Sequence, residues 1–199
     1  MPTIERRLHQ VDKYFITPNY IESESIDYFI KIEKILKSGI KIIQFRSKNL
    51  NIEDYSRVSK KIYSLCRKYN SIFIINDFKN FNLNKYCDGI QLTSKNLKNI
   101  NLVNFNKKYI LIGSCHNVQE IEMCNNLQLN LILISPVFDT NSKKGIGWLK
   151  FKELVKKSDI PAFALGGLSY TEHIENVKYN GGVGVAASSY FYNLFNTRK

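Results

Sequence analysis

The feature that most constrains the fold is a repeated alternation of short apolar runs with longer segments of mixed polarity. The apolar runs predict β-strands at 13–17, 40–48, 71–77, 88–92, 109–113, 131–134, 161–165 and 182–187. Helical periodicity or capping residues follow most runs, most clearly at 26–36, 51–69 and 118–127 and after Ser169 and Tyr190; the third and fourth helices are weak. Because parallel strands need such crossovers, these units predict an α/β fold, a single (β/α)8 TIM barrel with parallel strands.

The whole chain, residues 1–199, is expected to form this one barrel domain. Its 199 residues are 44% hydrophobic, which is enough for one sizeable core, and no Pro-rich or Ser/Gly-rich linker divides them. An open doubly wound sheet is the competing architecture. It predicts a Gly-rich phosphate-binding turn after the first strand, whereas Thr17-Pro18-Asn19 stands there.

Composition narrows the class of protein. No apolar run approaches the ~20 residues of a membrane span, and no secretory signal is recognisable, so a cytoplasmic protein is expected. The net charge of +12 is scattered rather than clustered, which argues against nucleic acid but would attract phosphorylated substrates. A homo-oligomer is left open. The cysteines form no C-x-x-C pair and predict neither a zinc site nor disulfides: Cys66, Cys87, Cys115 and Cys124.

Active sites of (β/α)8 barrels lie at the C-terminal ends of the strands, often with phosphate after the seventh and eighth. Any one polar residue at such a position can simply mark where a strand meets solvent, but here nearly every strand end is polar or Gly. The residues at these ends are Thr17, Gln44, Arg46, Lys48, Asn76, Asp77, Gln91, Ser114, His116, Thr140, Ser142, Lys143, Gly166, Gly167, Ser188 and Ser189.

Two cations follow the second strand. Gln44, Arg46 and Lys48 are spaced by two, so they share a face if the strand geometry persists, and the cations would then bind an anion. The alternative is that both cations pair with acids across the barrel. Asn76 and Asp77 supply an amide and a carboxylate that could hold Mg²⁺ against a diphosphate.

The fifth strand ends in Ser114-Cys115-His116. Neighbouring strand residues face opposite ways, so Cys115 and His116 make a poor nucleophilic pair, whereas Ser114 and His116 share a face. His116 is therefore a candidate proton carrier; the alternative is that it only helps to start the next helix. His9 and His173 lie away from the strand ends and receive no role.

The sixth strand leads into a loop that offers two hydroxyls and an ammonium within four positions, from Thr140, Ser142 and Lys143. These groups are donors for an anion, although an ordinary Lys-rich surface loop would have the same composition.

Two turns of small residues end the seventh and eighth strands. Gly166-Gly167 and Ser188-Ser189 can present N–H groups and hydroxyls to a phosphate, with helix N-termini behind them. Ordinary tight turns are the alternative. Two such turns on adjacent strands favour phosphate binding.

Taken in order, several motifs resemble the thiamine phosphate synthase and TenI superfamily. They are QFRSK at 44–48, IND at 75–77, GSCHN at 113–117, SPVFDTNSKKG at 135–145, ALGGL at 164–168 and GVAAS at 184–188. The resemblance covers nearly the whole chain and implies a small (β/α)8 barrel. Synthases of this family join hydroxymethylpyrimidine diphosphate to thiazole phosphate, and TenI-type relatives aromatise a thiazole carboxylate phosphate tautomer in the same pocket.

The resemblance also implies roles for individual residues. Gly167 and Ser188 would bind thiazole phosphate, Gln44 would lie on the pyrimidine side, Asp77 would be one Mg²⁺ ligand, and His116 would transfer the proton in a tautomerase. Mg²⁺ is expected only if diphosphate chemistry is retained. Positions that would contact diphosphate or pyrimidine are Arg46, Lys48, Asn76, Ser114, Thr140, Ser142 and Lys143.

Two departures from the synthase pattern favour the TenI branch. Asn96 stands where synthases usually carry a second Mg²⁺-binding Asp, which should weaken Mg²⁺ binding and impair diphosphate chemistry. The loop after Lys143 is also short, since Lys144-Gly145 is almost at the next helix. The sequence therefore predicts a thiazole tautomerase, with thiamine phosphate synthase as the first alternative and a non-catalytic binder of thiamine precursors as the second.

Overall fold

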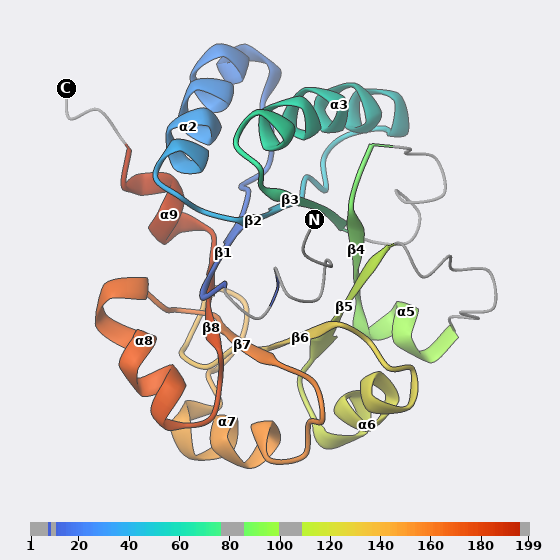
Figure 1. Ribbon diagram of the computed structural model, residues 1–199, viewed down its shortest axis with the longest axis vertical. Coiled ribbons are helices and arrows are strands. Elements are labelled where there is room, and N and C mark those ends of the chain that lie inside the picture. The colour runs from blue at the N-terminus through green and yellow to red at the C-terminus, as the bar shows by residue number, and fades with distance from the viewer. Residues whose placement is uncertain (1–7, 9–10, 77–85, 100–108, 196–199) are drawn as a thin grey trace.

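The protein is a closed ring of parallel strands surrounded by helices (Figure 1). This computed structural model describes residues 8, 11–76, 86–99 and 109–195. Each strand pairs in parallel with the next in the chain, and β8 closes onto β1, so the predicted (β/α)8 barrel is confirmed. The strands are β1 (Lys13–Ile16), β2 (Ile42–Phe45), β3 (Ile72–Asn76), β4 (Gly89–Leu92), β5 (Ile110–Cys115), β6 (Leu131–Ile134), β7 (Ala162–Leu165) and β8 (Gly184–Ala187).

The helices lie outside this ring (Figure 1). A short helix, α5, follows β4 where the sequence predicts a weak one, whereas residues 77–85, between β3 and β4, lie outside the described part of the chain. The helices described are η1 (Glu22–Glu24), α2 (Ser25–Lys37), α3 (Ile52–Lys68), α5 (Ser94–Asn99), α6 (Val118–Asn126), α7 (Gly147–Val155), α8 (Tyr170–Tyr179) and α9 (Ser189–Asn193).

Side chains alternate in direction along each strand, so the strands contribute to two hydrophobic cores. Side chains such as Tyr14, Ile74 and Phe163 fill the barrel interior, while their strand neighbours, such as Phe15 and Phe73, pack between the barrel and the helices. Both faces of each strand are thus covered, which explains why the strands are continuously apolar. Polar side chains appear where the strands end, and these ends form the mouth of the barrel.

The predicted helix over 26–36 is confirmed as α2, but two of its apolar residues are not buried. Its buried stripe contains Tyr28, Ile32 and Ile35, whereas Ile26 is 78% and Ile30 47% exposed. Ile26 and Ile30 each stand two positions from Tyr28, which is a rotation of roughly 200° on a helix. They therefore face away from the barrel although they are as apolar as the core residues.

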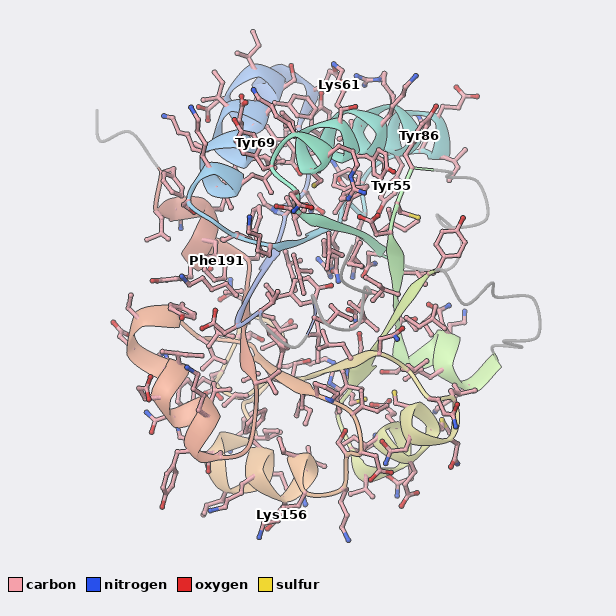
Figure 2. All side chains as sticks on the ribbon, in the orientation of Figure 1. Tyr55, Lys61, Tyr69, Tyr86, Lys156 and Phe191 are labelled. Carbon is pink, nitrogen blue, oxygen red and sulfur yellow. The ribbon has the colours of Figure 1, made fainter. Side chains whose placement is uncertain are left out.

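The cationic side chains are spread over the outer surface. Lys61 on α3 and Lys156 after α7 are both exposed and lie at opposite ends of the molecule (Figure 2). Among the helices described, none has both the length and the apolar character needed to cross a membrane.

Candidate active site

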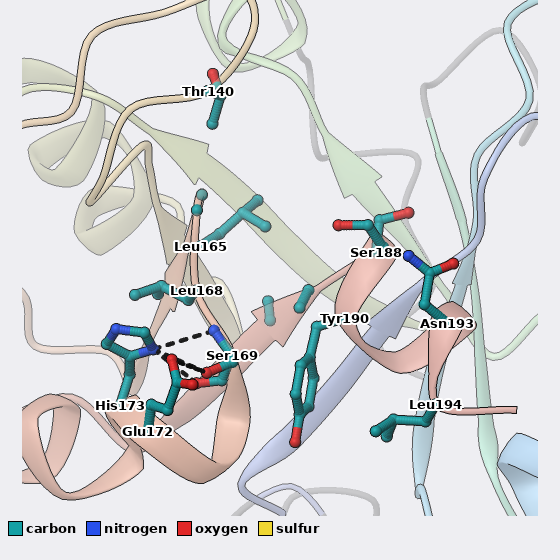
Figure 3. A pocket seen from close by; sticks show the side chains of 15 residues that line it. Thr140, Leu165, Leu168, Ser169, Glu172, His173, Ser188, Tyr190, Asn193 and Leu194 are labelled. Carbon is teal, nitrogen blue, oxygen red and sulfur yellow. Dashed lines mark hydrogen bonds between the residues drawn. The ribbon is translucent and has the colours of Figure 1, made fainter. Parts of the chain in front are cut away.

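A pocket of about 710 Å³ opens where β7 and β8 end (Figure 3). Four residues that the sequence predicts as ligand-binding line it together, from three different loops: Thr140, Gly166, Gly167 and Ser188. The remaining lining residues are Leu165, Leu168, Ser169, Glu172, His173, Ala186, Ala187, Ser189, Tyr190, Asn193 and Leu194. The two predicted phosphate turns therefore face one cavity.

The turn at Gly166 and Gly167 needs glycine for conformation and for space. Their φ angles are +102° and +67°, a region that side chains disfavour. A Cβ on Gly166 would stand 2.6 Å from the Cβ of Pro136, and one on Gly167 would stand 2.8 Å from the Cβ of Phe138. The Phe138 N–H also donates to the Gly166 carbonyl at 3.0 Å. The turn is thus held tightly against the loop that carries Thr140.

Gly166→Ala is expected to lower the free energy of unfolding by about 2–5 kcal/mol, because it adds a collision to the cost of a positive φ. Gly39→Ala is the matched control. Gly39 also has a positive φ, +95°, but an added Cβ would meet nothing within 4 Å. We expect the control to lose only about 1–2 kcal/mol. Urea unfolding of both variants measures the difference, and equal losses would contradict the collision.

Side chains from α8 and α9 complete the pocket, and apart from Ser189 sequence reasoning gave them no role. Ser169, Glu172 and His173 come from the α8 side, Ser188 from the end of β8, and Tyr190 lies between the two groups (Figure 3). His173 stands in the first turn of the helix that follows the Gly turn, and this spacing is the signal that could have placed it at the site.

Among the described residues that line the pocket, none is Lys or Arg. A phosphate here would therefore be bound by hydroxyls, by backbone N–H groups and by helix N-termini. His173 Nδ1 lies 3.1 Å from the Ser169 N–H nitrogen and 3.0 Å from the Ser169 carbonyl oxygen, so its ring is tied to the start of α8. Glu172 accepts a hydrogen bond from the Ser169 hydroxyl at 2.8 Å.

His116 stands at the mouth between a carbonyl and an ammonium. Its Nδ1 lies 2.5 Å from the Ser135 carbonyl oxygen, and its Nε2 lies 3.4 Å from Lys143 Nζ. A carbonyl only accepts and an ammonium only donates, so Nδ1 carries the proton and Nε2 keeps its lone pair. This tautomer gives His116 the form of a general base with Lys143 beside it.

Strand β5 separates the side chains of Ser114 and Cys115, as the alternation predicts. Ser114 accepts a hydrogen bond inside the barrel, whereas Cys115 is buried towards α6, with its Sγ 3.5 Å from Cys124 Sγ. Cys115 therefore takes no part in the mouth.

The loop between β6 and α7 folds on itself. Thr140 and Lys143 form a tight turn in which the Thr140 N–H donates to the Lys143 carbonyl at 2.9 Å and the Thr140 hydroxyl contacts the same carbonyl at 3.2 Å. Ser142, at the tip of this turn, is exposed. The Gly145 N–H donates to Asp139 at 2.6 Å and α7 begins two residues later, so the loop is as short as the sequence indicates.

The sequence predicts that Gln44, Arg46 and Lys48 share a face, which requires the second strand to continue to Lys48. Strand β2 ends at Phe45, where the backbone turns away because the Arg46 N–H donates to the Thr17 hydroxyl at 3.1 Å. Gln44 is buried inside the barrel, Arg46 is half-buried and Lys48 is exposed. Strand alternation therefore cannot orient the two cations, and their binding role stays a prediction.

The described residues do not by themselves form a Mg²⁺ site. Asp77 lies outside them, and in the part of the chain described no three His, Cys, Asp or Glu side chains gather as metal ligands. Asn76 is the last residue of β3 and half-buried. Asn96 Oδ1 accepts from the Thr93 N–H at 3.1 Å and from the Thr93 hydroxyl at 2.9 Å, so both its lone pairs are used at the start of α5.

A closed (β/α)8 barrel with polar strand ends and a pocket at its mouth has the architecture of a barrel enzyme. Over residues 13–191 the chain matches the family model described as thiamine monophosphate synthase. It therefore belongs to the thiamine phosphate synthase and TenI family of thiamine-biosynthetic enzymes, as its motifs suggest.

Named relatives point in the same direction. The putative thiamine-phosphate synthase 2 of Aquifex aeolicus is 30% identical over 163 residues, which cover 80% of this chain and 87% of that protein. The thiamine-phosphate synthase of Prochlorococcus marinus (strain AS9601) is 34% identical over 197 residues, 95% of this chain but only 53% of the relative, so this chain spans about half its length.

A solved structure agrees in fold. The thiamine phosphate pyrophosphorylase from Pyrococcus furiosus superposes with a TM-score of 0.75 at 23% identity, covering 92% of this chain and 88% of that one. The family model does not separate the TenI branch from the synthases, but the named relatives are synthases. The comparisons thus favour the synthase over the tautomerase that the sequence predicted.

Proposed function

We propose that this protein synthesises thiamine phosphate from hydroxymethylpyrimidine diphosphate and thiazole phosphate, with release of diphosphate. The observation that carries the proposal is the family match across residues 13–191, together with relatives named as synthases. The thiazole phosphate would occupy the pocket between Gly167 and Ser188, and the pyrimidine would lie over Gln44 and Ser114 at the floor of the mouth.

Lys143 has the chemistry to assist departure of the diphosphate. The leaving group gains negative charge as its bond to the pyrimidine methylene breaks, and a fixed ammonium lowers the energy of that charge. Lys143 is exposed, but the tight turn at Thr140 and the contact with His116 Nε2 hold its side chain at the mouth. Arg46, Lys48, Asn76, Thr140 and Ser142 are further proposed contacts for the phosphate groups.

A discontinuous assay of thiamine phosphate formation from the two substrates tests this function. Product formation that requires both substrates is the expected result. Tight binding of thiazole phosphate without any synthesis of thiamine phosphate would contradict the proposal and leave a tautomerase or a non-catalytic binder.

A thiazole tautomerase is the second candidate, and the tautomer of His116 favours it. An unprotonated Nε2 at the mouth is the group that would move a proton to and from a ring carbon. The engagement of Asn96 Oδ1 in the α5 cap points the same way, because it removes a ligand that diphosphate chemistry would use. Conversion of the thiazole carboxylate phosphate tautomer, followed by ultraviolet absorbance, distinguishes this candidate from the synthase.

Asn96→Asp is expected to lower the Mg²⁺ concentration that gives half-maximal synthesis, on the order of tenfold. A carboxylate has enough lone pairs to keep the Thr93 contacts and still offer an anionic oxygen to a cation. Asn126→Asp, on the exposed surface of α6, is the matched control for added charge. An identical Mg²⁺ dependence in both variants would show that position 96 does not contact the ion.

A further inference from the structure

Four polar side chains form a continuous hydrogen-bonded chain across the barrel interior. They come from four different strands: Tyr14 from β1, Gln44 from β2, Gln91 from β4 and Ser114 from β5. Gln44 Nε2 donates to the Tyr14 hydroxyl at 2.9 Å and to Gln91 Oε1 at 3.2 Å. Gln91 Nε2 donates to Ser114 Oγ at 2.8 Å.

This chain is closed to water over most of its length. Tyr14 is fully buried, and Gln44 and Gln91 are only 1% and 2% exposed. Burial also raises the pKa of the Tyr14 phenol, so the hydroxyl keeps its proton and donates to Gln91 Oε1 at 3.4 Å. Buried polar atoms are costly to leave unpaired, so these bonds hold the two carboxamides in one orientation.

The orientation of the Gln91 carboxamide determines whether the Ser114 hydroxyl accepts or donates a hydrogen bond on its inner side. Gln91 Oε1 accepts from both Gln44 and Tyr14, which leaves Gln91 Nε2 to donate to Ser114. Ser114 Oγ is therefore an acceptor on its inner side. Within the described residues no hydrogen bond uses the Ser114 proton, and Ser114 is half-buried at the mouth. Its O–H is free to donate outward.

We infer that Gln91 is a positioning residue, which fixes Ser114 as a hydrogen-bond donor to an acceptor atom of the ligand in the mouth. The inference rests on the proposed function for the identity of that ligand. Ser114 is not among the residues that line the pocket at β7 and β8, so the acceptor belongs to the pyrimidine diphosphate rather than to the thiazole phosphate.

A double-mutant cycle on binding tests the inference without requiring turnover. Calorimetric titration with hydroxymethylpyrimidine diphosphate should show roughly tenfold weaker binding for Ser114→Ala, and a similar loss for Gln91→Leu. The double variant should be no weaker than Ser114→Ala alone, because Gln91 acts through Ser114. Losses that multiply to roughly a hundredfold would overturn the inference.

Gln91→His should restore part of the binding that Gln91→Leu loses. No such recovery is expected if Gln91 only fills space. A neutral imidazole can accept on one nitrogen and donate on the other, as the carboxamide does. We expect this variant to bind the pyrimidine diphosphate more tightly than Gln91→Leu, and thiazole phosphate affinity should stay unchanged in all of these variants. A parallel loss for both ligands would overturn the assignment.

Nuclear magnetic resonance of the free protein tests the coupling between Gln91 and Ser114 without relying on the proposed function. Ser114→Ala should shift the side-chain NH₂ signals of Gln91 and speed their hydrogen exchange, whereas Ser188→Ala should leave them unchanged. If the wild type binds no pyrimidine diphosphate, the proposed substrate is wrong, and the Gln91 signals still decide whether Gln91 is coupled to Ser114. Unchanged Gln91 signals in Ser114→Ala would overturn the coupling.

Discussion

Replacing Lys143 by Met is expected to slow thiamine phosphate synthesis by about 10²- to 10³-fold, with a much smaller effect on substrate binding. The reason is that an ammonium next to the leaving diphosphate lowers the energy of the charge that develops there, and removal of one such donor typically costs this much. Methionine keeps most of the length of the side chain but cannot donate. Single-turnover kinetics with saturating substrates measures the effect on the chemical step.

Two further variants make this result specific. Lys144→Met removes the same charge from the next position of the same exposed loop and should stay close to wild type. His116→Asn removes the Nδ1 contact with the Ser135 carbonyl and the 3.4 Å contact to Lys143 Nζ, but it leaves the Lys143 ammonium in place. Only the contact to Lys143, worth about 1 kcal/mol, bears on the leaving group, so synthesis should fall by about tenfold or less.

The opposite pattern would contradict the synthase mechanism. A tautomerase with His116 as general base predicts that His116→Asn slows tautomer conversion by about 10²- to 10⁴-fold, whereas Lys143→Met has a small effect on that rate. The same two variants thus separate the two candidate reactions through the residues that each one uses.

The fold was predictable because every strand follows one rule. A parallel strand covered on both faces is continuously apolar, so runs such as Leu131–Ile134 are recognisable without knowledge of their partners. Capping residues are also local signals. Asn117 directly precedes the predicted helix over 118–127 and is of a residue type that caps helices; it accepts a hydrogen bond from the Glu120 N–H at 2.9 Å at the start of α6.

The site was predictable only in part, because its remaining features depend on tertiary contacts. Thr140, Gly166, Gly167 and Ser188 were found at one pocket because all follow barrel strands. The position of His173 in the same pocket depends on how α8 packs, which no strand rule contains. The early end of β2 depends on the contact between Arg46 and Thr17, twenty-nine positions apart.

Ser188→Asp is expected to weaken thiazole phosphate binding by at least about 100-fold. A carboxylate near a bound phosphate costs a few kcal/mol in a partly shielded pocket, and the substitution also removes a donor. Ser188 is the N-cap of α9 and its side chain makes no cap hydrogen bond, so Asp is compatible with the fold there. Substitution of Gly167 would instead confound binding with the collision against Phe138.

Matched variants separate local repulsion from a general effect of charge. Ser188→Ala removes only the hydroxyl and should lose about tenfold or less. Ser64→Asp makes the same substitution on the exposed surface of α3, away from the residues that line the pocket, and should bind as the wild type does.

Thiazole phosphate is expected to bind between the ends of β7 and β8. Calorimetric titration of the wild type, Ser188→Asp and Ser64→Asp with thiazole phosphate tests it most directly. We expect one binding site in the wild type and in Ser64→Asp, and an affinity at least about 100-fold lower in Ser188→Asp. Equal affinity in all three proteins would contradict it.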